Sequence, residues 1–110
     1  ENIKRILKAK RANFKWYKQL FNKINYLKIL EEPKHSKTNY WLITAVLKNL
    51  KLKNILLKNL KSKGYGLRTT WRPLHSLKIF KSCPRDNMKN SNDFFKKAIN
   101  FPSSPKINYK

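Results

Sequence analysis

A group of side chains suited to ligand binding lies near the middle of the chain, in the stretch GYGLRTTWRPLHSLKIF that covers residues 64–80. Arg68 can clamp a carboxylate or a phosphate through two parallel hydrogen bonds. Trp71 can stack on a ring, and His75 can donate or accept a proton near neutral pH. These residue types predict either one wall of a ligand pocket or a contact surface for a polyanion. The alternative is that the tryptophan and the leucines after it belong to the core, with the arginine on the surface.

Other arrangements that carry chemistry are missing from the sequence. Cys83 is the single cysteine, which excludes an internal disulfide, and with only His35 and His75 beside it there is no zinc-ligand spacing. The five acidic residues form no obvious acid/base pair, and the stretch GYG alone is no phosphate-binding loop. We therefore expect neither a metal site nor a catalytic residue in this chain.

The net charge of +22 over 110 residues has two interpretations. Clustered cations gain affinity for polyanions by releasing counterions from phosphates, so the charge favours an RNA or another polyanion as partner. However, the cations are 22 Lys against 5 Arg, they are spread along the whole chain, and 13 Asn accompany them. A drift in base composition produces this pattern, and such a chain would still bind polyanions nonspecifically.

Several features predict where the protein resides. A lone thiol is typical of a reducing cytoplasm, where we expect the chain. The longest apolar run, residues 40–47, is far shorter than the roughly 20 residues that cross a bilayer, and the charged opening ENIKR is no signal peptide, so no membrane contact is expected. The chain also begins without Met, which predicts a fragment or a processed product.

Apolar spacing predicts the elements that must position the central stretch. Residues 2–24 and 50–62 have the period of amphipathic helices, and Gly64 is placed to terminate the second one. Residues 26–30 and 40–47 have the composition of β-strands. The second stretch is apolar on both faces, which predicts a central strand. A further strand begins with the stretch GYGLRTT.

The C-terminal third is predicted to hold one more helix. HSLKIF could make one helical turn, and Ser91 is a credible N-cap, with Asp93 in the first turn and Ala98 and Ile99 on the apolar face. INFPSSP then leaves as an extended segment. This order predicts an α/β fold of the α+β type: one small domain over residues 1–110, with helices packed on one side of a mainly antiparallel sheet.

The sequence resembles the C-terminal part of the DegT/DnrJ-type sugar aminotransferases, which are fold-type-I enzymes that depend on pyridoxal phosphate (PLP). The similarity is greatest to the branch that makes amino sugars for legionaminic-acid-type surface glycans, and it covers essentially the whole chain. The matching positions are Asn39, Tyr40, Trp41, Leu42, Gly64, Arg68, Trp71, Leu74, His75, Leu77, Cys83, Pro84, Arg85, Pro102, Ser103, Ser104 and Pro105. Their spacing from Gly64 to Pro105 runs without a gap.

This resemblance implies that a keto nucleotide sugar is aminated, with glutamate as the donor, PLP as the carrier and a homodimer as the full enzyme. The lysine that forms the Schiff base lies in the family's large N-terminal domain, and no lysine of this chain matches its context. Residues 1–25 would be the helix that leads in from that domain. On its own the chain should therefore be inactive.

The resemblance also implies roles for five residues in binding substrate. Arg68 would hold an anionic group, and Trp71 and His75 would shape the cleft, with Asn39 and Trp41 as further choices. Two rival functions remain open. One is a stand-alone basic module that binds RNA or another polyanion, and the other is a nonfunctional remnant.

Overall fold

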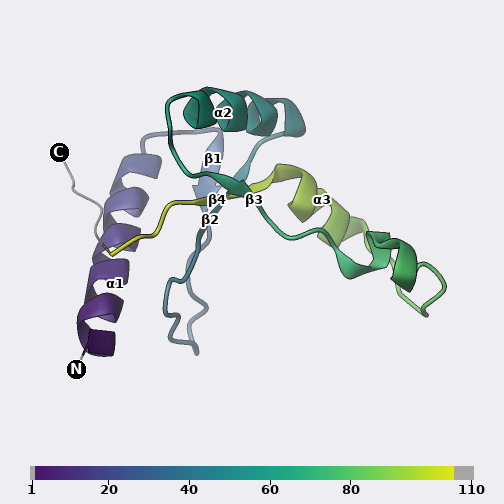
Figure 1. Ribbon diagram of the computed structural model, residues 1–110, viewed down its shortest axis with the longest axis horizontal. Coiled ribbons are helices and arrows are strands. Elements are labelled where there is room, and N and C mark those ends of the chain that lie inside the picture. The colour runs from purple at the N-terminus through teal and green to yellow at the C-terminus, as the bar shows by residue number, and fades with distance from the viewer. Residues whose placement is uncertain (1, 106–110) are drawn as a thin grey trace.

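The computed structural model describes residues 2–105 and shows a four-stranded antiparallel sheet with three α-helices (Figure 1). The sheet order is β1-β2-β4-β3, so β2 and β4 are central and β3 is an edge strand. The elements in chain order are α1 (Asn2–Phe21), β1 (Leu27–Ile29), β2 (Ile43–Leu47), α2 (Leu50–Ser62), β3 (Arg68–Thr69), two 3₁₀ turns (Leu74–Ser76 and Lys78–Phe80), α3 (Lys89–Lys97) and β4 (Ala98–Phe101). The expected fold class is confirmed.

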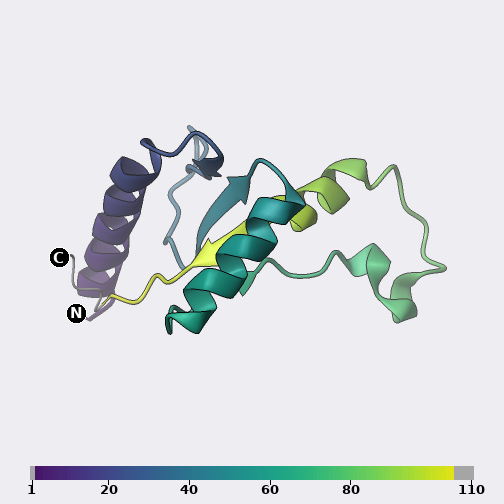
Figure 2. The same cartoon turned by 90° about the horizontal axis from the view of Figure 1, so that it is seen from above.

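The register of the sheet separates an apolar face from a face of mixed polarity. Ala45 lies opposite both Ile29 and Ile99, and Ile43 lies opposite Phe101. Residues that are directly opposite share a face, and neighbours along a strand alternate between faces. The apolar face joins the aromatic side chains of α1 in one core, against which leucines of α2 also pack. Figure 2 shows α2 lying across the sheet on this side.

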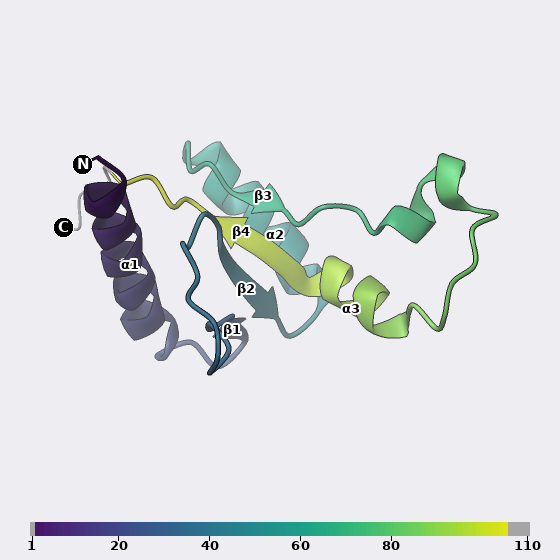
Figure 3. The same cartoon turned by 90° about the horizontal axis from the view of Figure 1, so that it is seen from below.

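The opposite face of the sheet carries polar side chains from three strands beside the apolar pair Val46 and Ala98. Arg68 of β3 lies opposite Asn100 of β4, which lies opposite Thr44 of β2. The Thr44 hydroxyl donates to the Asn100 side-chain oxygen at 2.7 Å. Figure 3 looks from this side, with α2 behind the strands. We call this side the open face.

Helix α2 has the predicted bounds because both of its ends are specified by capping residues. The Asn49 side-chain oxygen accepts from the Leu52 N–H at 3.0 Å. At the other end Gly64 has φ +81°, and the N–H groups of Gly64 and Tyr65 donate to the carbonyls of Lys61 and Leu60. This pair of bonds defines a Schellman motif, in which a glycine adopts the left-handed conformation at little cost.

Two predicted bounds are wrong near the N-terminus. α1 ends at Phe21 rather than at residue 24, because the next residues form tighter turns, with the Ile24 N–H donating to the Phe21 carbonyl at 2.9 Å. β2 begins at Ile43 rather than at Tyr40. Tyr40 has φ +49° and its ring stacks on Phe14 at a centroid distance of 4.1 Å, so packing on α1 removes it from the strand.

The predicted start and end of the last helix are also wrong. α3 begins at Lys89 without a side-chain cap, and the Asn87 side-chain oxygen accepts from the Lys89 N–H, so the chain turns before Ser91 and Asp93 is not in the first turn. Ala98 and Ile99 belong to β4 and are fully buried in the sheet. Helix and strand therefore meet without a loop.

Residues 70–97 project from the sheet and return through α3, as all three overall views show (Figures 1–3). We call this segment the arm and the rest of the described chain the body. The Cα radius of gyration is 15.8 Å, whereas a compact domain of this length has about 13 Å. No helix within residues 2–105 is long and apolar enough to span a bilayer.

Candidate functional site

A pocket of about 340 Å³ opens where the open face of the sheet meets α1 and the segment after β4. Two of the five residues singled out by the sequence, Trp41 and Arg68, line it. Its remaining lining residues are Lys10, Leu42, Gly66, Asn100, Phe101, Pro102, Ser103 and Ser104. The pocket therefore combines an indole and two cations with amide and hydroxyl groups.

Arg68 reaches the pocket from the edge strand β3. Its side chain is exposed, and within residues 2–105 it has no hydrogen bond or ion pair. Its neighbour across the ladder, Asn100, is buried and is held by Thr44. An unpaired guanidinium beside a fixed amide can bind a carboxylate or phosphate in a planar, two-bond geometry.

Trp41 lines this pocket, and Trp71 lies against Trp41 without lining the pocket itself. Their ring centroids are 5.6 Å apart, and the two side chains are 63% and 67% exposed. Trp41 is held at its backbone, because its N–H donates to the Asn39 side-chain oxygen at 2.9 Å and its carbonyl accepts from the Ser103 hydroxyl. Asn39 therefore orients the turn that presents Trp41 and does not line the pocket itself.

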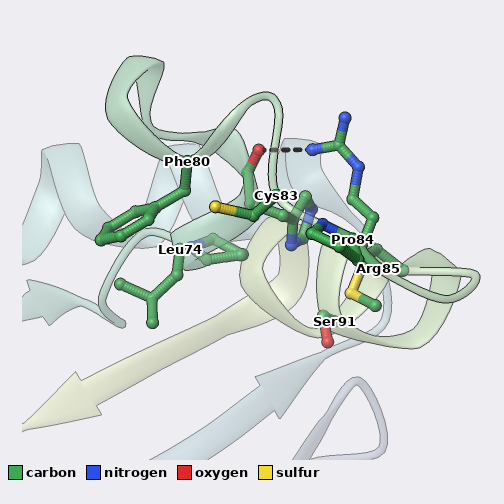
Figure 4. A pocket seen from close by; sticks show the side chains of 9 residues that line it. Leu74, Phe80, Cys83, Pro84, Arg85 and Ser91 are labelled. Carbon is green, nitrogen blue, oxygen red and sulfur yellow. Dashed lines mark hydrogen bonds between the residues drawn. The ribbon is translucent and has the colours of Figure 1, made fainter.

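His75 lies in the arm, away from these groups. It lines a separate hollow of about 430 Å³ with Leu74, Phe80, Cys83 and Arg85. Figure 4 labels these four neighbours. Its Nε2 is 2.9 Å from the Asn92 side-chain oxygen. The structure thus brings Arg68 and Trp41 into one pocket, places Trp71 against Trp41, and leaves His75 in a separate hollow.

Arg85 holds this second hollow together. Its guanidinium donates to the carbonyls of His75 and Lys81, both at 3.0 Å. Figure 4 marks the first of these bonds with a dashed line. Cys83 is exposed and unpaired with another cysteine. Within the described residues, no three His, Cys, Asp or Glu side chains gather into a group that could hold a metal ion.

Lys10 is a pocket residue that was not predicted to bind a ligand, although it belongs to the opening helix that resembles the family. Its ammonium donates to the Ser103 carbonyl at 2.9 Å and to the Ser103 hydroxyl at 3.2 Å. The contact joins residues 93 positions apart, so no local pattern marks this lysine among the 22 in the chain. The ungapped stretch that ends in Pro102 and Ser103 was the available indication that this region contributes to a site.

The described residues do not fit a complete PLP site. A lysine that forms a Schiff base needs a lowered pKa and an open site beside it. Burial lowers the pKa of Lys53, but its ammonium donates to the Phe95 carbonyl at 2.5 Å and lies 5.0 Å from that residue's ring centroid. Of the acidic residues in the body, Glu31 is paired with Lys18 and Glu32 with Arg11.

Comparisons with known proteins agree with this architecture. The chain matches the family model of the DegT/DnrJ/EryC1/StrS aminotransferases over residues 1–110. Among solved structures it is similar to Helicobacter pylori PseC, an aminotransferase involved in the biosynthesis of pseudoaminic acid, at TM-score 0.80 and 17% identity. That alignment covers 93% of this chain and 28% of PseC.

Two further structures show the same relationship. The putative sugar aminotransferase Spr1654 of Streptococcus pneumoniae aligns with TM-score 0.78 and 19% identity, over 94% of this chain and 27% of Spr1654. DesI, solved in the presence of its TDP-sugar product, aligns with TM-score 0.81 and 14% identity, over 93% of this chain and 27% of DesI. The chain thus spans little more than a quarter of the length of each of these proteins, and it belongs to the DegT/DnrJ/EryC1/StrS aminotransferase family.

Proposed function

We propose that this chain is the C-terminal small domain of a PLP-dependent aminotransferase that aminates a keto nucleotide sugar for surface-glycan synthesis. Residues 1–25 lead in from a large domain that carries the Schiff-base lysine, and glutamate donates the amino group. The observation that carries this proposal is the pocket on the open face, whose lining offers two cations and one indole to a ligand but no carboxylate and no imidazole. The chain alone is then inactive.

The residues of this chain bind and orient rather than react. Arg68 holds an anionic group of substrate or donor, and Trp41 and Trp71 limit the ring positions that a bound molecule can take. PLP, when bound between the domains, supplies the electron sink. We assign no proton transfer to this chain, because none of its described acidic residues lines the pocket.

The exposed surface supports a role within a larger assembly. The chain exposes 9074 Å², whereas a compact monomer of 13.2 kDa exposes about 6,400 Å². Apolar side chains contribute to the exposed surface: Leu74 and Ile79 of the arm are 66% and 78% exposed. Large apolar side chains gathered on one segment are typical of a surface that another domain or subunit covers. A homodimer in the cytoplasm fits this surface and the free thiol.

The polyanion alternative has one observation in its favour. A groove of about 620 Å³ runs beside α1 and has cations as most of its lining residues, namely Lys4, Lys8, Arg11, Lys15 and Lys37. No aromatic residue lines it. Proteins that bind single-stranded nucleic acid add aromatic stacking to such a groove, so we favour the small-domain function over both a stand-alone binding module and a remnant.

The DNA upstream of the Glu1 codon tests this proposal. We expect an open reading frame that encodes a large α/β domain with a PLP-binding lysine, in frame with residue 1. The protein made from that longer frame should bind PLP and aminate a keto nucleotide sugar with glutamate. A stop codon or an unrelated sequence directly upstream would contradict the proposal.

A further inference from the structure

A row of cations follows one side of α1, on a different face of the helix from the open-face pocket. The members of the row are separated by four, three and four residues, which keeps them within about 60° of one another around the helix axis. They are Lys4, Lys8, Arg11 and Lys15. Lys10, which lines the open-face pocket, is two residues from Lys8 and therefore about 160° around the helix. The row thus forms a separate surface, to which the small-domain function assigns no role.

The loop between β1 and β2 forms the second wall of a groove along this row. Arg11 holds the two walls together, because its guanidinium donates to the Thr38 carbonyl at 2.6 Å and lies 3.6 Å from a Glu32 carboxylate oxygen. Glu32 also accepts from the Thr38 N–H at 2.8 Å, which closes the loop on itself. Figures 1 and 3 show the loop beside α1. The groove of about 620 Å³ is therefore preformed, and Lys37 lines it from the loop.

Apart from Arg11, the cations of this groove have no hydrogen-bond or ion-pair partner among residues 2–105. They are Lys4, Lys8, Lys15 and Lys37, and all four are exposed. No described acidic residue lines the groove. Two lysines at i and i+4, such as Lys4 and Lys8, repel one another on a helix. An anion between them relieves this repulsion, so the groove favours a ligand of high negative charge.

The residue types of the groove indicate a chain of phosphates. A lysine ammonium is a compact point charge that binds phosphate without the planar geometry of an arginine fork. Lys4 and Lys15 are separated by a rise of about 16 Å along α1, so a single small anion cannot reach both. No aromatic side chain lines the groove, whereas proteins that bind single-stranded nucleic acid hold its bases by stacking. A linear polyanion without bases fits the charge, the length and the lining of the groove.

We propose that the groove between α1 and the β1–β2 loop binds inorganic polyphosphate, with lysines of both walls as its ligands. Lys4, Lys8 and Lys15 contact the chain from α1, and Lys37 contacts it from the loop that Arg11 fixes in place. This binding is a second property of the domain, beside the amination of a nucleotide sugar. It needs neither the open-face pocket nor a large domain, so the inference does not rest on the proposed function.

Binding of medium-chain polyphosphate to the 110-residue chain can be measured by calorimetry at several salt concentrations. We expect polyphosphate to bind more tightly than triphosphate at equal phosphate concentration, because only the longer chain reaches from Lys4 to Lys15. It should also bind more tightly than the RNA homopolymer poly(U), whose bases find no stacking partner in the groove. Equal affinity for triphosphate would overturn the extended site. Tighter binding of poly(U) would identify a nucleic acid as the partner and overturn the assignment to polyphosphate.

Paired substitutions separate the groove from the general charge of the chain. Lys8→Gln/Lys37→Gln removes one cation from each wall and should weaken polyphosphate binding by about 3-fold to 20-fold, as expected for two exposed ion pairs. The magnitude of the slope of log K against log salt should fall by about 1.4, at about 0.7 for each lost phosphate contact. The matched control Lys51→Gln/Lys58→Gln removes two exposed charges from α2. It should change the affinity less than about twofold, because salt screens exposed charges outside the groove.

The outcomes decide between a built groove and net charge alone. Equal losses in the groove pair and the control pair would show that only net charge matters and would overturn the site. The substituted lysines are exposed, so these proteins should keep the thermal stability of the wild type. A second groove pair, Lys4→Gln/Lys15→Gln, should give a similar loss from the α1 wall alone. Unchanged affinity in both groove pairs would reject the inference, whether or not a longer protein aminates a nucleotide sugar.

Discussion

The body and the arm of this chain differ in what orders them. The body buries thirteen apolar side chains, and twelve of them form one core cluster. The arm, residues 70–97, buries none of its residues and is ordered by local bonds, such as those from Arg85 to two carbonyls. Burial of apolar surface is the main source of stability. Burial of its own apolar side chains can therefore stabilise the body. The apolar side chains of the arm are exposed, and another domain or subunit would have to cover them.

The same substitution made in the two regions gives the largest expected contrast. Ile99 of β4 is fully buried and Ile79 of the arm is 78% exposed. Ile99→Ala should lower the free energy of unfolding by about 2–5 kcal/mol, because it removes apolar groups that are buried away from water and leaves a cavity in the core. Ile79→Ala should change it by less than about 0.5 kcal/mol. Urea unfolding of both variants measures the difference, and similar losses would show that the arm is part of the cooperative core.

Lys53 ties α3 to the body, and its removal should loosen that connection. It is 4% exposed, and its ammonium donates to the Phe95 carbonyl in the last turns of α3. Lys53→Ala should cost about 1.5–3 kcal/mol, the range for a hydrogen bond to a charged group. Lys51→Ala, on the exposed side of α2, is the matched control and should cost less than about 0.5 kcal/mol.

Hydrogen exchange shows where the Lys53 substitution acts. Amides of α3 should exchange faster in Lys53→Ala, while those of α1 should change only as much as the global stability does. Uniformly faster exchange across both helices would mean that Lys53 supports the whole body rather than the attachment of α3.

The turn between α2 and β3 tests a smaller effect with two neighbouring glycines. Gly64 has φ +81°, whereas Gly66 does not have a positive φ, and a Cβ would meet no atom within 4 Å at either position. Gly64→Ala should therefore cost about 1–2 kcal/mol through backbone strain alone. Gly66→Ala should be neutral or slightly stabilising. Equal effects on thermal unfolding would contradict a specific role for the Schellman motif.

Elements with local determinants could be predicted from the sequence, and those set by distant contacts could not. The bounds of α2 follow from apolar spacing, Asn49 and Gly64, all within or beside the helix. The spacing of Ala98 and Ile99 fits a helix equally well, and their place in β4 depends on pairing with β2 more than fifty residues earlier. Hydrophobic period alone cannot decide such cases.

The site follows the same rule. Arg68, Trp71 and Trp41 could be proposed from residue type and from the family resemblance. In the structure Arg68 and Trp41 line one pocket, and Trp71 lies against Trp41. Lys10 could not, because its contact with Ser103 joins the two ends of the described chain. His75 belongs to the arm, and its position relative to the pocket would depend on what the arm packs against.

The smallest expected effect is a pH dependence within the body. Burial lowers the pKa of Lys53 below the usual 10.5, so between its folded pKa and 10.5 the unfolded chain binds more protons than the folded one. The free energy of unfolding therefore rises with pH across this window. Burial, with Glu32 as a second cause, raises the pKa of Tyr40 above 10.0, so its contribution is present below pH 10.0 and is lost as pH rises through the folded value.

Unfolding of the wild type, Lys53→Met and Tyr40→Phe by urea between about pH 8 and pH 11 separates these opposite contributions. The stability of the wild type relative to Lys53→Met should increase with pH, because the methionine has no proton to release. Its stability relative to Tyr40→Phe should decrease above about pH 10, since the phenol of the unfolded chain ionises first. A substitution in the arm, such as Ile79→Ala, should leave both slopes unchanged, because neither titrating side chain lies in the arm. Parallel curves for the wild type and Lys53→Met would mean that the buried ammonium is as well solvated in the body as in the unfolded chain.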